Sequence, residues 1–85
     1  MATPAWKAAS DVSEGYLTLN VVSLKKYEKH ELDALQKEIE RLSRDLRGQV
    51  VPQEEAEAIQ TRSRKLLRLS HASAVIQAWR ARMRR

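Results

Sequence analysis

The C-terminal part of the chain carries the residue types best suited to binding chemistry. The whole chain has a net charge of only +5, yet no acid follows Glu57, and the bases beyond it are Arg62, Arg64, Lys65, Arg68, Arg80, Arg82, Arg84 and Arg85. Apolar side chains recur among these bases at helical spacing, namely Leu69, Ile76, Trp79 and Met83. A helix of this kind presents an apolar face with a cationic rim, which complements an acidic protein that has a hydrophobic groove.

The segment AVIQAWRARMRR, residues 74–85, resembles an IQ motif, the helix that calmodulin and myosin light chains bind. The resemblance implies that the partner is calmodulin or another EF-hand protein. Together, the motif and the apolar face give the following expected contact residues: Leu69, Val75, Ile76, Gln77, Trp79, Arg80, Met83 and Arg85.

Two registers of the motif are open. In the first, Ile76 and Gln77 take the positions of the branched apolar residue and the glutamine. In the second, Val75 takes the apolar position, and Arg80 and Arg85 take the two basic positions. The choice bears on calcium, because calcium-independent binding in the family relies on the glutamine.

The same residues allow other roles. The stripe from Leu69 to Met83 has the spacing of a coiled-coil seam, so it could pack inside a structural subunit. Arginines attract nucleic acids, but Trp79 is the only nearby aromatic residue and the sequence contains no known nucleic-acid module. A membrane-surface helix is disfavoured because the bulky apolar face is thin.

Catalytic chemistry has no support in the sequence. His30 and His71 are far apart, neither has a companion at ligand spacing, and the chain has no cysteine and no glycine-rich phosphate loop. We therefore expect a non-enzymatic protein without a cofactor or a metal, in which both histidines are solvated helix residues.

A second stripe predicts the element that supports the C-terminal helix. Within residues 23–47, apolar residues are spaced three and four apart, which is the repeat of a coiled coil. The other faces hold acids and bases at helical spacings, as a solvated surface should. The expected coiled-coil contacts are Leu32, Leu35, Ile39, Leu42 and Leu46.

Gly48 and Pro52 predict a turn over residues 48–52, followed by a long basic helix over residues 53–85. Residues 1–22 contain Pro4, Gly15 and several small polar residues, which indicates an irregular or extended arm. The predicted fold is therefore all-α, either a helical hairpin or a two-segment coiled-coil helix kinked at Pro52.

The absence of cysteine favours an intracellular location. No apolar run approaches the ~20 residues needed to span a bilayer, and the N-terminus lacks the pattern of a secretory signal. We expect a cytoplasmic adaptor. IQ-like segments often occur in cytoskeletal and ciliary assemblies, so such an assembly, with a coiled-coil partner, is its expected setting.

Overall fold

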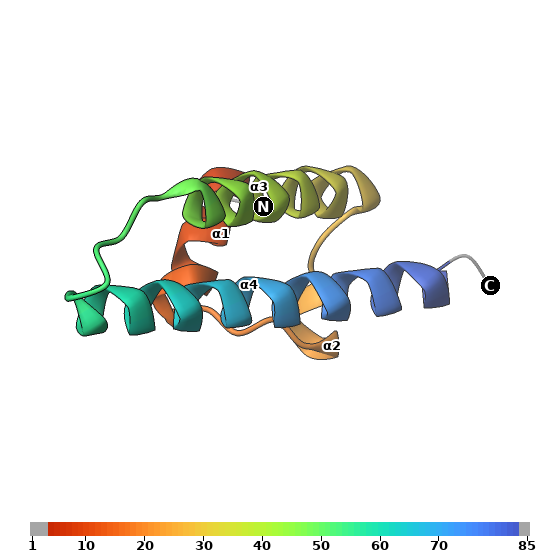
Figure 1. The fold of residues 1–85 in the computed structure, drawn as a ribbon. Helices are drawn as coiled ribbons and strands as arrows, with labels where there is room; N and C mark the ends of the chain where they lie inside the picture. Colours follow the sequence, from red (N-terminus) through yellow and green to blue (C-terminus); the bar gives the residue numbers. More distant parts are fainter. Residues whose placement is uncertain (1–3, 84–85) are drawn as a thin grey trace.

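The computed structural model describes residues 4–83, and within them the chain is all-α (Figure 1). The helices in chain order are α1 (Ala5–Glu14), α2 (Val21–Leu24), α3 (Lys29–Gly48) and α4 (Ala56–Met83). The predicted fold class is confirmed.

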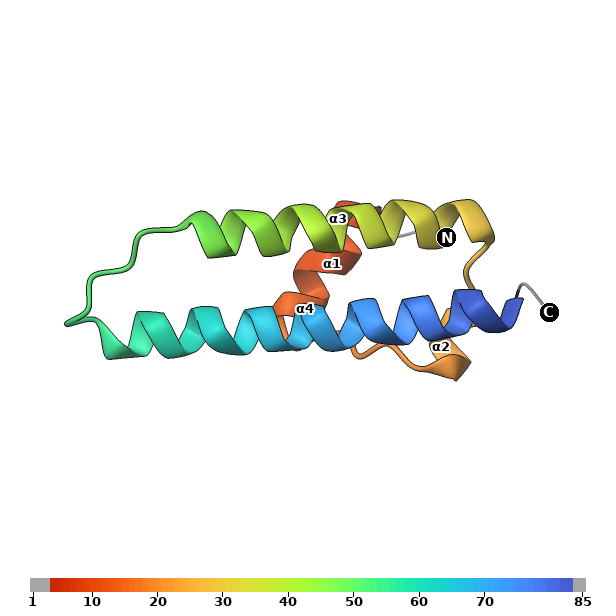
Figure 2. The same cartoon turned by 45° about the vertical axis from the view of Figure 1, so that its right-hand side comes forward.

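The two long helices form an antiparallel hairpin, with α3 and α4 side by side (Figure 2). The alternative of one long helix kinked at Pro52 is wrong, because the chain reverses direction between α3 and α4. The predicted helix start after Pro52 is also wrong. Pro52 opens a separate turn, in which the Glu55 N–H donates to the Pro52 carbonyl over 3.0 Å, and α4 begins only at Ala56. A longer loop results, and the Arg62 Nη1 ties it to α4 by donating to the Gln49 carbonyl over 2.9 Å.

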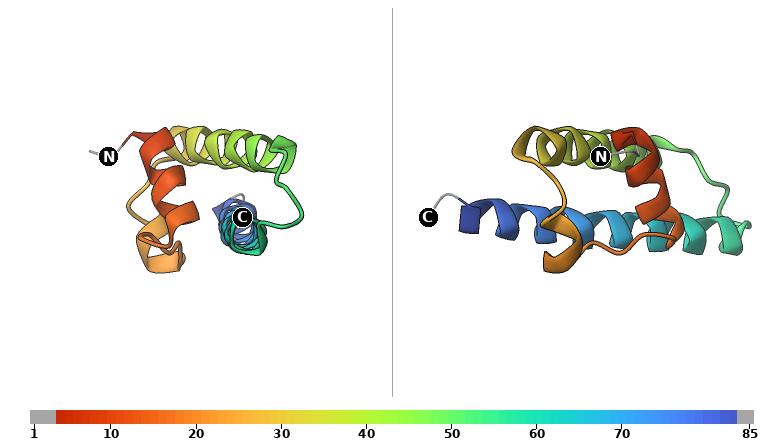
Figure 3. Two further views of the ribbon diagram at one scale, coloured as in Figure 1. Left: turned by 60° about the vertical axis from the view of Figure 1, so that its left-hand side comes forward. Right: turned by 180° about the vertical axis from the view of Figure 1, so that it is seen from behind.

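Helix α1 crosses one face of this hairpin and packs against both α3 and α4 (Figure 3). The prediction of an irregular or extended arm over residues 1–22 is therefore wrong for residues 5–14, and also for residues 21–22, which belong to α2. The face of α1 that meets the hairpin consists of Ala8, Ala9 and Val12, each at most 3 % exposed. These small side chains let the backbone of α1 lie close to both long helices.

Gly15 ends α1 because its φ of +85° is a left-handed conformation that glycine adopts without steric strain. There the Tyr16 N–H donates back to the Asp11 carbonyl over 2.8 Å. The chain then runs without regular structure to Asn20, whose side chain accepts from the Ser23 N–H over 3.0 Å and starts α2.

The predicted helix over residues 23–47 is divided by this arrangement. Its first residues belong to α2, and α3 begins only at Lys29, where the Glu28 N–H donates to Glu31 Oε1 over 2.9 Å. The Glu31 side chain thus has the role that the third helical residue plays in a capping box, where it satisfies a backbone donor at the helix start. The break lets α2 pack against α4 while α3 packs beside α1.

One hydrophobic core joins all four helices. Leu24 of α2 is fully buried, as are Leu32, Leu35 and Ile39 of α3. From α4 the core takes Leu69, Ala72 and Ile76, and from the segment before α2 it takes Leu19. The core is therefore larger than a two-helix seam, because the N-terminal segment covers one side of it.

Candidate partner-binding face of α4

The predicted apolar face of α4 points mainly into the core. Leu69 and Ile76 are 0 % exposed. Trp79 is half-buried and packs against the same core, whereas Met83, near the end of the helix, is 46 % exposed. The structure brings these side chains onto one helix face, but α3 and the N-terminal segment already cover most of that face.

The other predicted contact residues within the described range lie around the edge of this face. Val75 is half-buried against the core. Gln77 is exposed, and its Nε2 donates to Ser73 Oγ on the previous turn over 3.3 Å. Arg80 is half-buried and pairs with Asp33 of α3. Arg85 lies outside the described residues.

The residues predicted to contact this helix lie opposite it in the core. Leu46 is 6 % exposed and Leu42 is half-buried against the core, while the earlier residues of the stripe are fully buried. The two apolar stripes therefore pack against each other. Helix α1 also contacts both long helices, so the packing is not that of a two-stranded coiled coil.

A buried polar contact between α3 and α4 was missed by the sequence reasoning. Gln36 is only 7 % exposed, and its Nε2 donates to Ser73 Oγ over 2.7 Å and to Glu40 Oε1 over 3.2 Å. A hydrogen bond in such an interface contributes about 0.5–1.5 kcal/mol and fixes the relative position of the helices. Gln36 adjoins Leu35 in the sequence, so the spacing of polar residues beside the stripe was the available signal.

Several bases of α4 are occupied within the fold. Lys65 Nζ lies 3.0 Å from Glu14 Oε1, and the Arg68 Nη1 donates to the Ser13 carbonyl over 3.0 Å. The guanidinium of Arg82 lies 5.6 Å from the centre of the Trp79 ring, at the distance of a cation–π contact. Arg64 is exposed and makes no ion pair with any residue of the described range. The basic end therefore stabilises the fold and still presents positive charge to solvent.

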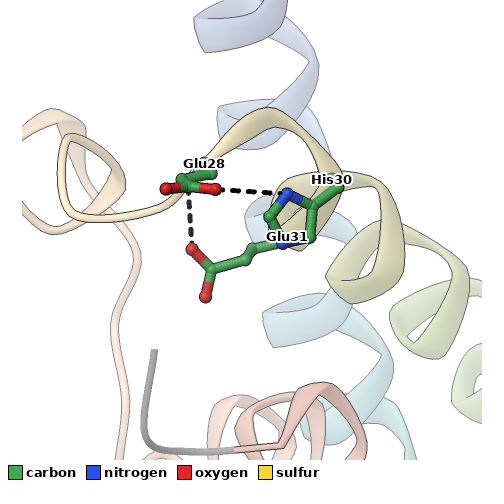
Figure 4. Close-up of side chains that lie close together, drawn as sticks. All are labelled: Glu28, His30 and Glu31. Carbon is green, nitrogen blue, oxygen red and sulfur yellow. Dashed lines mark hydrogen bonds and ion pairs between the residues drawn. The ribbon is translucent and has the colours of Figure 1, made fainter.

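The start of α3 gathers three possible metal-ligating side chains, shown in Figure 4. His30 Nδ1 lies 3.3 Å from Glu28 Oε2, and one ligand atom from each of Glu28, His30 and Glu31 falls within 4.8 Å of the others. The hydrogen bond from the Glu28 backbone N–H lowers the pKa of Glu31 below its ordinary value. The helix cap accounts for this cluster, and His30 is the exposed helix residue that the sequence predicted.

Among residues 4–83, none of the helices combines the length and the apolar character needed to cross a bilayer.

Comparisons with known proteins give no family for this chain. No protein-family model matches it, and neither does any curated protein or solved structure.

Proposed function

We propose that the protein is a non-enzymatic adaptor whose helix α4 docks calmodulin or a similar acidic EF-hand protein. One observation carries the proposal. Leu69, Ile76 and Trp79 share one face of a helix that bears only basic charges from residue 58 onward. An amphipathic basic helix fits the hydrophobic groove and acidic rim of such a partner.

Docking by this face requires α4 to separate from α3, because Leu69 and Ile76 have no exposed surface in the closed hairpin. Full burial of a Leu or Ile side chain is worth about 1.5–3 kcal/mol. A nanomolar complex supplies about 12 kcal/mol, which is enough to replace these contacts with contacts to the partner. The apparent affinity is then reduced by the fraction of molecules that are open.

Titration of the full chain with calmodulin tests the proposal. A Trp6→Phe variant leaves Trp79 as the only tryptophan, so its fluorescence reports the transfer of this side chain into a groove. We expect saturable binding with a change in the Trp79 emission, in calcium or in chelator. Absence of binding in both conditions contradicts the proposal.

The same titration separates the two registers of the motif. Gln77 is exposed, and its one side-chain hydrogen bond within residues 4–83 is to Ser73 of its own helix, so Gln77→Ala leaves the core intact. A selective loss of binding in chelator supports the register anchored on Ile76 and Gln77. Unchanged binding supports the register led by Val75.

The alternative function is a coiled-coil structural subunit in which residues 69–83 form a permanent seam. The full burial of Leu69 and Ile76 favours it. A permanent seam predicts that calmodulin leaves the Trp79 emission unchanged, and that sedimentation shows either self-association or a stable closed monomer. A third candidate, nucleic-acid binding, predicts tight binding that weakens steeply with salt.

For the setting, we propose a cytoplasmic assembly of the cytoskeleton or the cilium, with a coiled-coil protein as a further partner. This part of the proposal rests on the IQ-like segment alone. Imaging of a tagged full chain tests it, and a diffuse signal with no enrichment on filaments or axonemes contradicts it.

A further inference from the structure

A groove lies beside α4, on the side of the helix that carries Leu67, Arg68 and His71. The end of α1 and the segment of residues 15–19 line it. This segment runs alongside α4 (Figures 1 and 3). Its volume is about 490 Å³. Its principal lining side chains are Val12, Leu17, Leu19, Leu67, Arg68 and His71.

The groove has an apolar wall that the fold leaves open. Leu67 is 72 % exposed, and Leu17 beside it is half-buried. Leu67 is two residues from Leu69 and nine from Ile76, so at 100° per residue it points roughly opposite to both. The closed hairpin therefore offers Leu67 to a partner without any rearrangement of the core.

A positioned guanidinium lies at the same groove. The Arg68 Nη1 donates to the Ser13 carbonyl over 3.0 Å, in the last turn of α1. Gly15 permits this approach, because a Cβ there would lie 3.3 Å from the Arg68 Cζ. Arginine has five N–H donors, and within residues 4–83 only this one hydrogen bond of Arg68 is formed. The other donors of a pre-oriented guanidinium suit a carboxylate.

The charged side chains that α4 presents at the groove are basic. Arg64 and Arg68 are exposed on this part of α4, which contains no acid. Glu14, at the end of α1, pairs with Lys65 over 3.0 Å and so is already compensated. An acidic ligand is therefore attracted to this rim.

We propose that this groove binds an acidic segment of a partner protein, in which an aliphatic side chain is flanked by carboxylates. The aliphatic side chain contacts Leu67 and Leu17, and a carboxylate accepts hydrogen bonds from Arg68. The site goes beyond the proposed function, because it works while the hairpin is closed and does not use Leu69 or Ile76.

The test uses the full ¹⁵N-labelled chain and a short peptide probe with one leucine between aspartate and glutamate residues. Two matched probes carry serine in place of the leucine, or lysine in place of the acids. We expect the first probe to shift the amide signals of Gly15, Leu17, Leu67 and His71, and both matched probes to bind at least about tenfold more weakly, as expected for loss of a buried leucine or a charge-assisted pair.

Variants of the chain locate the site. Leu67→Ser lowers the affinity of the chain for the first probe about tenfold, because it removes the apolar contact. Val50→Ser is its control, since Val50 is 96 % exposed in the loop and outside the groove. Arg68→Gln also lowers the affinity for this probe. Its control is Arg44→Gln, which removes the same charge from α3, outside this groove, and leaves the affinity unchanged.

Three outcomes overturn the inference. One is equal binding of the leucine and serine probes, which indicates a general attraction between charges. Another is a set of shifted amides that lies outside the groove. The third is a preference of the same amides for a short RNA over the acidic peptide. A failure of this inference is distinguishable from a failure of the calmodulin proposal. Ile39→Ala favours the open hairpin and is expected to strengthen calmodulin binding, whereas it is not expected to strengthen binding of the acidic probe.

Discussion

The guanidinium of Arg80, near the end of α4, forms an ion pair with the carboxylate of Asp33, near the start of α3. Arg80 occupies a basic position of the IQ-like segment in the register led by Val75. In the closed hairpin, α3 therefore supplies the acidic group that an EF-hand partner would supply in the complex. In the proposed complex, the hairpin and the partner would compete for the Arg80 side chain.

This competition predicts the effect of Asp33→Asn. The two side chains are 28 % and 40 % exposed, so loss of the pair should lower the free energy of unfolding by at most about 1 kcal/mol. The same loss favours release of α4, and the affinity for calmodulin should rise up to about fivefold. Calorimetric titration with calmodulin measures the affinity of the native chain and of Asp33→Asn.

Asp45→Asn is the matched control for this substitution. Asp45 pairs with Arg41 over 3.1 Å within α3, and both side chains are exposed. The control changes the charge of α3 equally but breaks no contact with α4. An equal gain in affinity from both variants would show that net charge, and not the pair with Arg80, is responsible.

Gly15→Ala tests how the end of α1 is built. Alanine at a φ of +85° costs about 1–2 kcal/mol, and its Cβ would lie 3.3 Å from the Arg68 guanidinium. We expect a loss of at least about 1 kcal/mol in the free energy of unfolding, measured with urea.

Gly48→Ala serves as the comparison, because Gly48 lies at the end of α3 with nothing within 4 Å of an added Cβ. Replacement of glycine at a compatible position stabilises by about 0.4–1 kcal/mol. Equal destabilisation by both substitutions would contradict the special role of Gly15.

Tyr27 links the core to alkaline stability. Burial, followed by the charge of Glu31, raises the pKa of Tyr27 above its ordinary value of 10.0. The pKa of Tyr27 is higher in the folded chain than in the unfolded chain. The stability that comes from keeping Tyr27 neutral in the fold is therefore fully present below about pH 10, and it is lost as pH rises through the folded pKa.

Phenolate absorbance measures this shift in a Tyr16→Phe variant, which leaves Tyr27 as the only tyrosine. We expect Tyr27 to ionise at higher pH in the folded chain than in urea. Identical titration curves for the folded and the urea-unfolded chain would contradict the effect of burial on the Tyr27 hydroxyl.

The sequence predicted the parts of the fold that depend on large, regularly spaced side chains. Leu32, Leu35 and Ile39 show the helical period clearly, and they form the centre of the core. The hairpin followed from Gly48 and Pro52, although the connection is longer than expected because Pro52 forms its own turn.

Helix α1 was missed because its buried face carries little hydrophobic signal. Ala8 and Ala9 contribute little area to a core, and Val12 alone does not define a period. Their value arises only when α1 crosses both long helices, which depends on contacts distant in the sequence. Gly15 was the local signal of a helix end that the sequence reasoning did not use.

The candidate site was predicted in composition but not in exposure. The spacing placed Leu69, Ile76 and Trp79 on one face, and the structure agrees. Spacing is the same for a docking face and for a packing seam, so it does not decide between them. The groove beside Leu67 depends on the path of residues 15–19 and had no sequence signal.

Two isoleucines give the most direct measurement of the central claim, that α4 leaves α3 to dock a partner. Ile39 and Ile76 are both 0 % exposed, and each replacement by alanine should destabilise the hairpin by about 2–5 kcal/mol. In a calmodulin titration of the full chain, Ile39→Ala should bind more tightly than the native chain, because it favours the open form and keeps the docking face. Ile76→Ala should bind more weakly, because it removes an anchor. Equal effects of the two substitutions on affinity, or no binding by any of the three chains, would contradict the account.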